Sequence, residues 1–226
     1  MWWRSGIVST LQFVACMTVP AFSQSSAYDD FERHTLGPDW LITTGPGVTV
    51  GIIGNSDMGI INGPGMTLGG AGVRYVAQTF AADQFSEFMI SPDKHDSMLC
   101  QASVRYRSLD NARYGFHWNN AFGGRWEIKY DGVPTPQTRI VASAIGPPPQ
   151  AGDTLRLEAI GATLTGYWNN VALLSAPDTA ADAILTAGPP GIVFRYTTTF
   201  PNQYPAPVTE WWRGGDVLTT SLSAIV

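Results

Sequence analysis

The 226-residue sequence has few charged residues, two cysteines and no run of basic residues. Charged residues make up 14% of the chain, and 18 Asp and Glu residues outnumber 13 Lys and Arg residues, which gives a formal net charge of −5. Proteins that bind nucleic acid normally carry a basic patch or stripe, so nucleic acid is not an expected partner. Apolar residues reach 44% of the chain. That is enough to build a core, and it argues against an intrinsically disordered chain.

The N-terminal segment, residues 1–23, has the order of a secretory signal peptide. Arg4 comes first, an apolar stretch follows, and Ala21-Phe22-Ser23 supplies small residues at the predicted cleavage site. The apolar stretch is shorter than the roughly 20 residues of a membrane span. We therefore predict residues 24–226 as a single mature domain without a membrane span, located outside the cell or in the periplasm.

The two cysteines lead to separate predictions. Because Cys16 lies inside the predicted signal peptide, the mature chain keeps Cys100 alone, and no disulfide is expected within it. In an alternative interpretation, Phe13 to Cys16 form a lipobox and Cys16 is a lipid-anchored N-terminus. We predict that Cys100 is a small buried apolar residue, as free cysteines commonly are.

Glycine and proline, in contrast, are abundant. The 24 Gly and 16 Pro residues are spread along the chain, which disfavours long helices and suits short strands joined by tight turns. The clearest pattern is an antiparallel meander over residues 98–107, 114–119 and 125–130. In the last of these segments, aromatic or aliphatic residues alternate strictly with charged ones, so one side packs in a core and the other faces water. We predict an all-β fold, a two-sheet antiparallel β-sandwich.

Polar side chains on one side of this meander form the candidate binding surface. Guanidinium and amide groups make paired hydrogen bonds with ligands rich in hydroxyl and carboxylate groups, such as glycans. The alternative is a solvated face whose charges pair only with one another. The residues concerned are Arg105, Arg107, His117, Asn119, Arg125 and Glu127.

Two pairs of adjacent aromatic residues, Tyr167-Trp168 and Trp211-Trp212, offer a second way to bind sugar. Neighbours on a strand point to opposite faces, so one residue of each pair is expected outside the core. We predict that Tyr167 and one of the two tryptophans at 211 and 212 stack on sugar rings.

The segment from Gly152 to Glu158 reads GDTLRLE, and Gly161, Leu164, Tyr167 and Asn169-Asn170 follow it. It resembles the GD-x-L-x-L signature of the concanavalin A-like lectin/glucanase superfamily, with a LamG-like jelly roll. The opening residues Asp29-Asp30-Phe31 and the closing residues Gly214-Gly215-Asp216 are also similar to strands of that superfamily. The resemblance implies a two-sheet jelly roll, one sheet of which often binds sugar.

The same resemblance bears on catalysis. Retaining glucanases of the superfamily carry two carboxylates on one strand as E-x-D-x-x-E or a close variant, and hydrolysis needs two carboxyl groups about 5 to 10 Å apart. Residues 125–130 contain Glu127 alone. We therefore predict a carbohydrate-binding domain without catalytic activity, whose partner is a glycan or a glycan-bearing surface. The alternatives are a glycoside hydrolase with Glu127 as a catalytic carboxylate, and a structural or adhesive surface protein.

No cofactor is predicted apart from an alternative structural calcium ion. The first and last strands often lie together in this fold, which would bring Asp30 and Asp216 into one region. Calcium takes six or more oxygen ligands, so these two carboxylates would be part of a larger set. Without calcium, the two residues are edge charges that discourage pairing between sheets of different molecules.

Overall fold

The computed structural model describes residues 25–44, 49–54, 56–61, 69–92, 100–119, 124–132, 138–196 and 208–218. The predicted signal peptide at residues 1–23, with Cys16, lies outside these ranges. Within them, no helix is long and apolar enough to cross a membrane.

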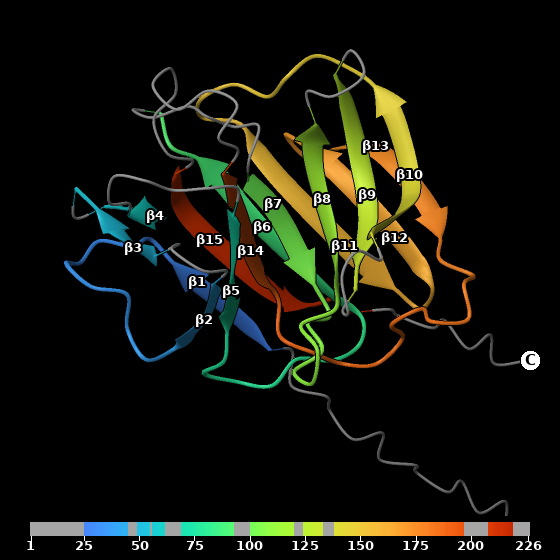
Figure 1. Ribbon diagram of the computed structural model, residues 1–226, viewed down its shortest axis with the longest axis horizontal. Helices are drawn as coiled ribbons and strands as arrows, with labels where there is room; N and C mark the ends of the chain where they lie inside the picture. Colours follow the sequence, from blue (N-terminus) through green and yellow to red (C-terminus); the bar gives the residue numbers. More distant parts are fainter. Residues whose placement is uncertain are drawn as a thin grey trace, which may run out of the picture.

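The predicted all-β fold is confirmed. The described residues form two antiparallel sheets that pack face to face (Figure 1). Sheet A contains β1 (Ser26–Asp29), β3 (Thr49–Ile53), β4 (Asp57–Ile61), β6 (Gln84–Ile90), β11 (Thr154–Ile160), β12 (Thr163–Trp168), β13 (Val171–Pro177) and β15 (Val208–Asp216). Its order is β13-β12-β11-β6-β15-β4-β3, and β1 also pairs with β15.

Sheet B carries the predicted meander. It contains β2 (Trp40–Thr44), β5 (Gly69–Tyr75), β7 (Cys100–Val104), β8 (Arg113–Asn119), β9 (Arg125–Asp131), β10 (Thr138–Ile145) and β14 (Gly191–Tyr196). Its order is β10-β9-β8-β7-β14-β5-β2. The three meander strands are therefore neighbours, and alternation gives them a common core side and a common outer side.

The core lies between the two sheets. Alternate residues of β8 and β9 point into it, and the rings of Phe116 and Trp126 stack with centroids 5.2 Å apart. Leu155 and Leu157 of β11 are buried on the sheet A side. Cys100 is fully buried, as predicted.

The first and last strands lie together, as predicted. β1 pairs with β15 along its whole length, from Ser26 opposite Gly215 to Asp29 opposite Trp212. Trp212 is fully buried and contacts the ring of Trp40, whereas Trp211 is half-buried. One residue of this aromatic pair thus lies outside the core, and it is Trp211.

Candidate functional site

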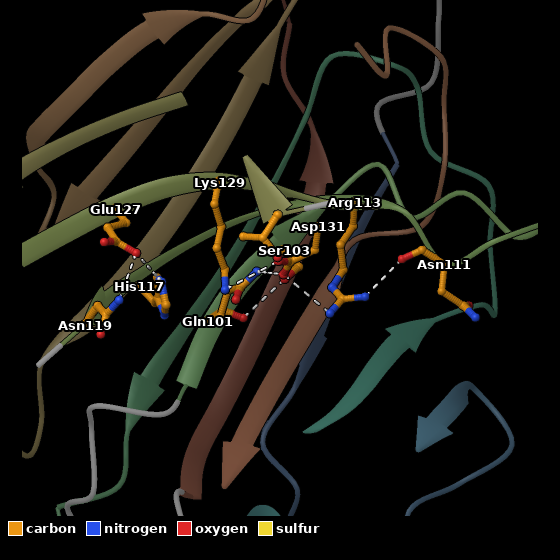
Figure 2. A network of polar contacts seen from close by, with 10 residues as sticks. Gln101, Ser103, Asn111, Arg113, His117, Asn119, Glu127, Lys129 and Asp131 are labelled. Atoms are coloured by element: carbon orange, nitrogen blue, oxygen red, sulfur yellow. Dashed lines mark hydrogen bonds and ion pairs between the residues drawn. The ribbon is translucent and has the colours of Figure 1, made fainter. Parts of the chain in front are cut away.

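The outer side of β7, β8 and β9 holds a continuous set of polar side chains, which we call the polar face (Figure 2). Direct pairing of His117 with Glu127 and of Asn119 with Arg125 brings side chains of adjacent strands side by side. Arg113 is likewise opposite Asp131. The polar face consists of Gln101, Ser103, Arg113, His117, Asn119, Arg125, Glu127, Lys129 and Asp131.

At one end of the polar face, the neighbouring side chains make their hydrogen bonds to Glu127. His117 Nε2 lies 3.3 Å from Glu127 Oε2, and Asn119 Nδ2 donates to the same oxygen at 3.2 Å. Burial opposes ionisation of this carboxyl, but the hydrogen bonds from His117 and Asn119 outweigh it and hold the pKa of Glu127 below its ordinary value. Glu127 is therefore a carboxylate at neutral pH and acts as a hydrogen-bond acceptor.

At the other end of the polar face, the neighbouring side chains contact Asp131. Its carboxylate accepts hydrogen bonds from Gln101 Nε2 and Thr138 Oγ1, each at 3.3 Å. Lys129 Nζ lies 3.5 Å from one of its oxygens and Arg113 Nη2 lies 3.6 Å from the other. Two cations therefore share one anion, and four strands, β7 to β10, are joined through their side chains.

Gly115 leaves the space that this arrangement needs. It lies between Arg113 and His117 on the outer side of β8, and a Cβ atom there would be 1.4 Å from Gln101 Nε2. The absence of a side chain lets Gln101 extend across β8 towards Asp131. The polar groups are thus held in a defined arrangement by the sheet below them.

The central residues of the polar face are more buried than the sequence predicted for a surface that faces water. Lys129, Glu127 and His117 are 2%, 5% and 6% exposed, whereas Asn119, Arg125 and Arg113 are half-buried. Buried polar groups must be hydrogen-bonded or paired, and the contacts of Glu127 and Asp131 meet that requirement. The groups that a ligand can reach are those at the margin, above all Asn119 and Arg125.

The structure places Arg105 outside the polar face, which corrects the predicted alternation. β7 ends at Val104, and Arg105 has a φ of 55°, which turns the chain out of the strand. The guanidinium is 1% exposed and donates to three backbone carbonyls. Gln101 and Ser103 supply the outer side of β7 instead.

Arg107 also lies away from the polar face. It follows β7 by three residues and pairs with Asp110 within the turn that leads to β8. Because the strand has already ended, strand alternation no longer decides where this side chain points.

Tyr167 lies on the outer side of sheet A, away from the polar face of sheet B. Its hydroxyl donates to Glu158 at 3.4 Å, and the guanidinium of Arg156 lies 5.7 Å from its ring centroid. Tyr167 is outside the core, as predicted, but the structure does not bring it together with His117 or Glu127.

Asp30 and Asp216 are not brought together either. Asp216 accepts hydrogen bonds from the backbone of Ser25 and Ala81, at one end of β1. Asp30 follows the other end of β1, five residues or about 16 Å along the strand, and accepts one from the backbone of Glu32. The structure therefore does not show Asp30 and Asp216 in one cluster, and a structural calcium ion stays a prediction. In the described part of the chain, no group of three or more His, Cys, Asp or Glu residues could hold a metal ion.

Five members of the polar face were not among the predicted site residues, although a signal was available: Gln101, Ser103, Arg113, Lys129 and Asp131. The alternation of residues 125–130 continues to Asp131, which ends β9 on the same side as Glu127. Gln101 precedes Ser103 by two residues and so shares its side of β7. Extending the predicted strand 125–130 by one residue would have found Asp131, and following the alternation inside the predicted segment 98–107 would have found Gln101.

Comparison with known proteins finds solved structures with a similar fold. No protein-family model matches the chain, and no curated protein matches it by sequence. Among solved structures, the carbohydrate recognition domain of Emp47p is similar with a TM-score of 0.56 and 10% identity, over 86% of this chain and 97% of that one. The carbohydrate-binding module CBM66 from Bacillus subtilis gives a TM-score of 0.51 and 13% identity, over 76% and 91% of the two chains.

An enzyme is similar to the same degree. The β-glucanase of Bacillus licheniformis gives a TM-score of 0.53 and 11% identity, over 85% of this chain and 98% of that one. Sequence identities this low support a shared fold but not a shared activity. The chain therefore shares a two-sheet antiparallel β-sandwich fold with these structures, as the GD-x-L-x-L segment that leads into β11 led us to expect.

Proposed function

We propose that this chain binds carbohydrate through the polar face of sheet B without cleaving it. The observation that carries the proposal is the ordered set of donors and acceptors on β8 and β9. Asn119 and Arg125 are half-buried at its margin, and Glu127 and His117 lie beside them. Sugar hydroxyls both donate and accept hydrogen bonds, so amide, guanidinium and carboxylate groups on one surface suit them.

The existing hydrogen bonds favour binding for an energetic reason. A ligand that orders long side chains pays roughly 0.5–1.5 kcal/mol for each of them. Asn119 is already held by Glu127, so little of that cost remains when a glycan binds. Two of the similar structures are named as a carbohydrate-binding module and a carbohydrate recognition domain, which supports the same class of ligand.

A glycan microarray followed by calorimetry with the best oligosaccharide tests the proposal. Asn119→Ala and Arg125→Ala should each weaken binding by about tenfold, which corresponds to about 1.4 kcal/mol. Arg213→Ala, on the outer side of sheet A, is the matched control and should bind as the unchanged chain does. Failure of the unchanged chain to bind any glycan would contradict the proposal, and so would equal binding by all three variants.

Glycoside hydrolysis is the second candidate, because Glu127 and Asp131 lie on the same side of β9. Their α-carbons are four residues, or about 13 Å, apart on the strand, whereas the two carboxyl groups of glycosidases are about 5 to 10 Å apart. Both carboxylates are also paired with cationic or amide groups. Binding alone is therefore the better-supported function.

Release of reducing ends from β-glucans distinguishes the two candidates. Under the binding proposal, the unchanged chain releases none above the level of a Glu127→Gln variant. Release that Glu127→Gln and Asp131→Asn both abolish would replace binding with hydrolysis as the function.

A further inference from the structure

A cavity of about 420 Å³ lies at one end of the sandwich, separate from the centre of the polar face. Its walls come from β2, β5, the loop after β5, the loop after β7 and the loop before β14, and Figure 1 shows these three loops at the same end of the molecule. Its volume is in the usual range for small-molecule sites, about 300–1,000 Å³.

The lining of this cavity is mainly apolar. Leu41 and Val76 are exposed at its rim, and Phe80 is buried. Pro189 contributes a further apolar surface. A sugar would leave most of its hydroxyl groups without partners against such a lining, so the cavity requires a different class of ligand from the polar face.

Arg74 places a positive charge in this cavity. It is 8% exposed, and its Nη1 donates to Asn111 Oδ1 at 3.2 Å. Its guanidinium also lies 6.0 Å from the ring centroid of Tyr106. Within the ranges that the structure describes, no carboxylate lies within 4.0 Å of Arg74. A buried cation without an anionic partner is unfavourable, and an anionic ligand would relieve that cost.

Gln78 supplies a second polar group. Its Nε2 is buried and has no hydrogen-bond partner among the residues that the structure describes. Buried amides are rarely left without a partner in native proteins, and such groups call for an explanation. An oxygen acceptor on a bound ligand would satisfy this donor and Arg74 together.

We propose that this cavity binds a small organic acid with an apolar body. The carboxylate pairs with Arg74, whose planar guanidinium matches a carboxylate through two parallel hydrogen bonds. The amide of Gln78 donates to the ligand, and the apolar body lies against Leu41, Val76, Phe80 and Pro189. The site is independent of glycan binding at Asn119 and Arg125.

Calorimetry of the full chain with matched pairs of probes tests the proposal. The probes are butanoate, phenylacetate and octanoate, each compared with its neutral amide. At least one carboxylate should bind more tightly than its amide by about tenfold or more, because the amide lacks the charge that pairs with Arg74. Arg74→Gln should remove that preference, while Arg213→Gln, which removes an exposed arginine of sheet A, should keep it.

A second variant keeps the test decisive if Arg74→Gln fails to fold. Val76→Trp narrows the rim of the cavity from an exposed position and leaves the guanidinium intact, so it should weaken carboxylate binding by about tenfold. The proposal is overturned if no carboxylate binds at millimolar concentration, if carboxylates and amides bind equally, or if Val76→Trp binds as the unchanged chain does. Glycan binding, measured in parallel, should be unaffected by Val76→Trp.

Discussion

Arg105 shows how a single residue can end a strand pattern and tie distant segments together. Its guanidinium donates to the carbonyl oxygens of Ala82, Ile184 and Gly161 at 2.8–2.9 Å. Burial lowers the pKa of Arg105, and the negative charge of Asp83 opposes that effect. An arginine with this role belongs to the folding of the domain and not to ligand recognition.

Arg105→Met should lower the free energy of unfolding by about 2–4 kcal/mol, because it leaves buried carbonyl groups without donors. Arg107→Met should cost about 0.5 kcal/mol or less, since the side chain of Arg107 is 41% exposed and water weakens its ion pair with Asp110. Urea unfolding of both variants measures the difference. Similar losses for the two would show that Arg105 is not the anchor inferred from its contacts.

At the scale of the elements, β8 and β12 pack closely because residue 166 of β12 is a glycine, which has no side chain. Gly166 of β12 faces Phe116 of β8, and a Cβ atom at position 166 would lie 2.4 Å from the Phe116 ring. Phe116 also stacks on Trp126 of β9, so the ring has little room to move. The spacing of the two sheets at this point therefore depends on glycine.

Gly166→Ala should lower the free energy of unfolding by about 1–3 kcal/mol, the usual cost of overpacking a core. Gly37→Ala is the matched control, because a Cβ atom at Gly37 meets nothing within 4 Å. Thermal unfolding of the two variants gives the comparison. A Gly166→Ala chain as stable as the Gly37→Ala chain would mean that the sheets separate at little cost.

At the scale of the whole molecule, Asp178 joins the two sheets. It directly follows β13 of sheet A, and its carboxylate accepts hydrogen bonds from Tyr114 of β8 and Arg139 of β10, both in sheet B. Burial favours the protonated form, but the hydrogen bonds from Arg139 and Tyr114 outweigh it and lower the pKa of Asp178. The contact therefore depends on pH.

Because its pKa is lower in the folded than in the unfolded chain, Asp178 adds stability above its unfolded pKa of about 3.9. That stability is lost as the pH falls through the folded pKa. Asp178→Asn should lower the free energy of unfolding by about 1–3 kcal/mol at neutral pH, and the gap to the unchanged chain should narrow in acid. Urea unfolding at about pH 7, 5 and 3 checks this, with exposed Asp182→Asn as a control. A gap that stays constant or widens in acid would contradict the prediction.

Much of the fold could be predicted from short-range pattern. The alternation in residues 125–130 and the turn residues around it predicted β9 and its core side, because side chains on a strand alternate by backbone geometry alone. His117, Asn119, Arg125 and Glu127 were placed on one face for the same reason. That reasoning failed at Arg105, where a positive φ ends the strand.

The sequence by itself determined that the chain forms short strands and which side of β8 and β9 carries the residues of the core, since both depend on neighbours a few positions away. Outside the predicted meander, only the tertiary structure decided how the strands are ordered in the two sheets. That order also decided the separation of Asp30 from Asp216 and of Tyr167 from the polar face. The tertiary structure also decided that Gln101 reaches Asp131 across Gly115 and that Arg74 lies in a cavity without a carboxylate partner among the described residues. These contacts join segments far apart in the chain through hydrogen bonds and packing, which no local periodicity encodes.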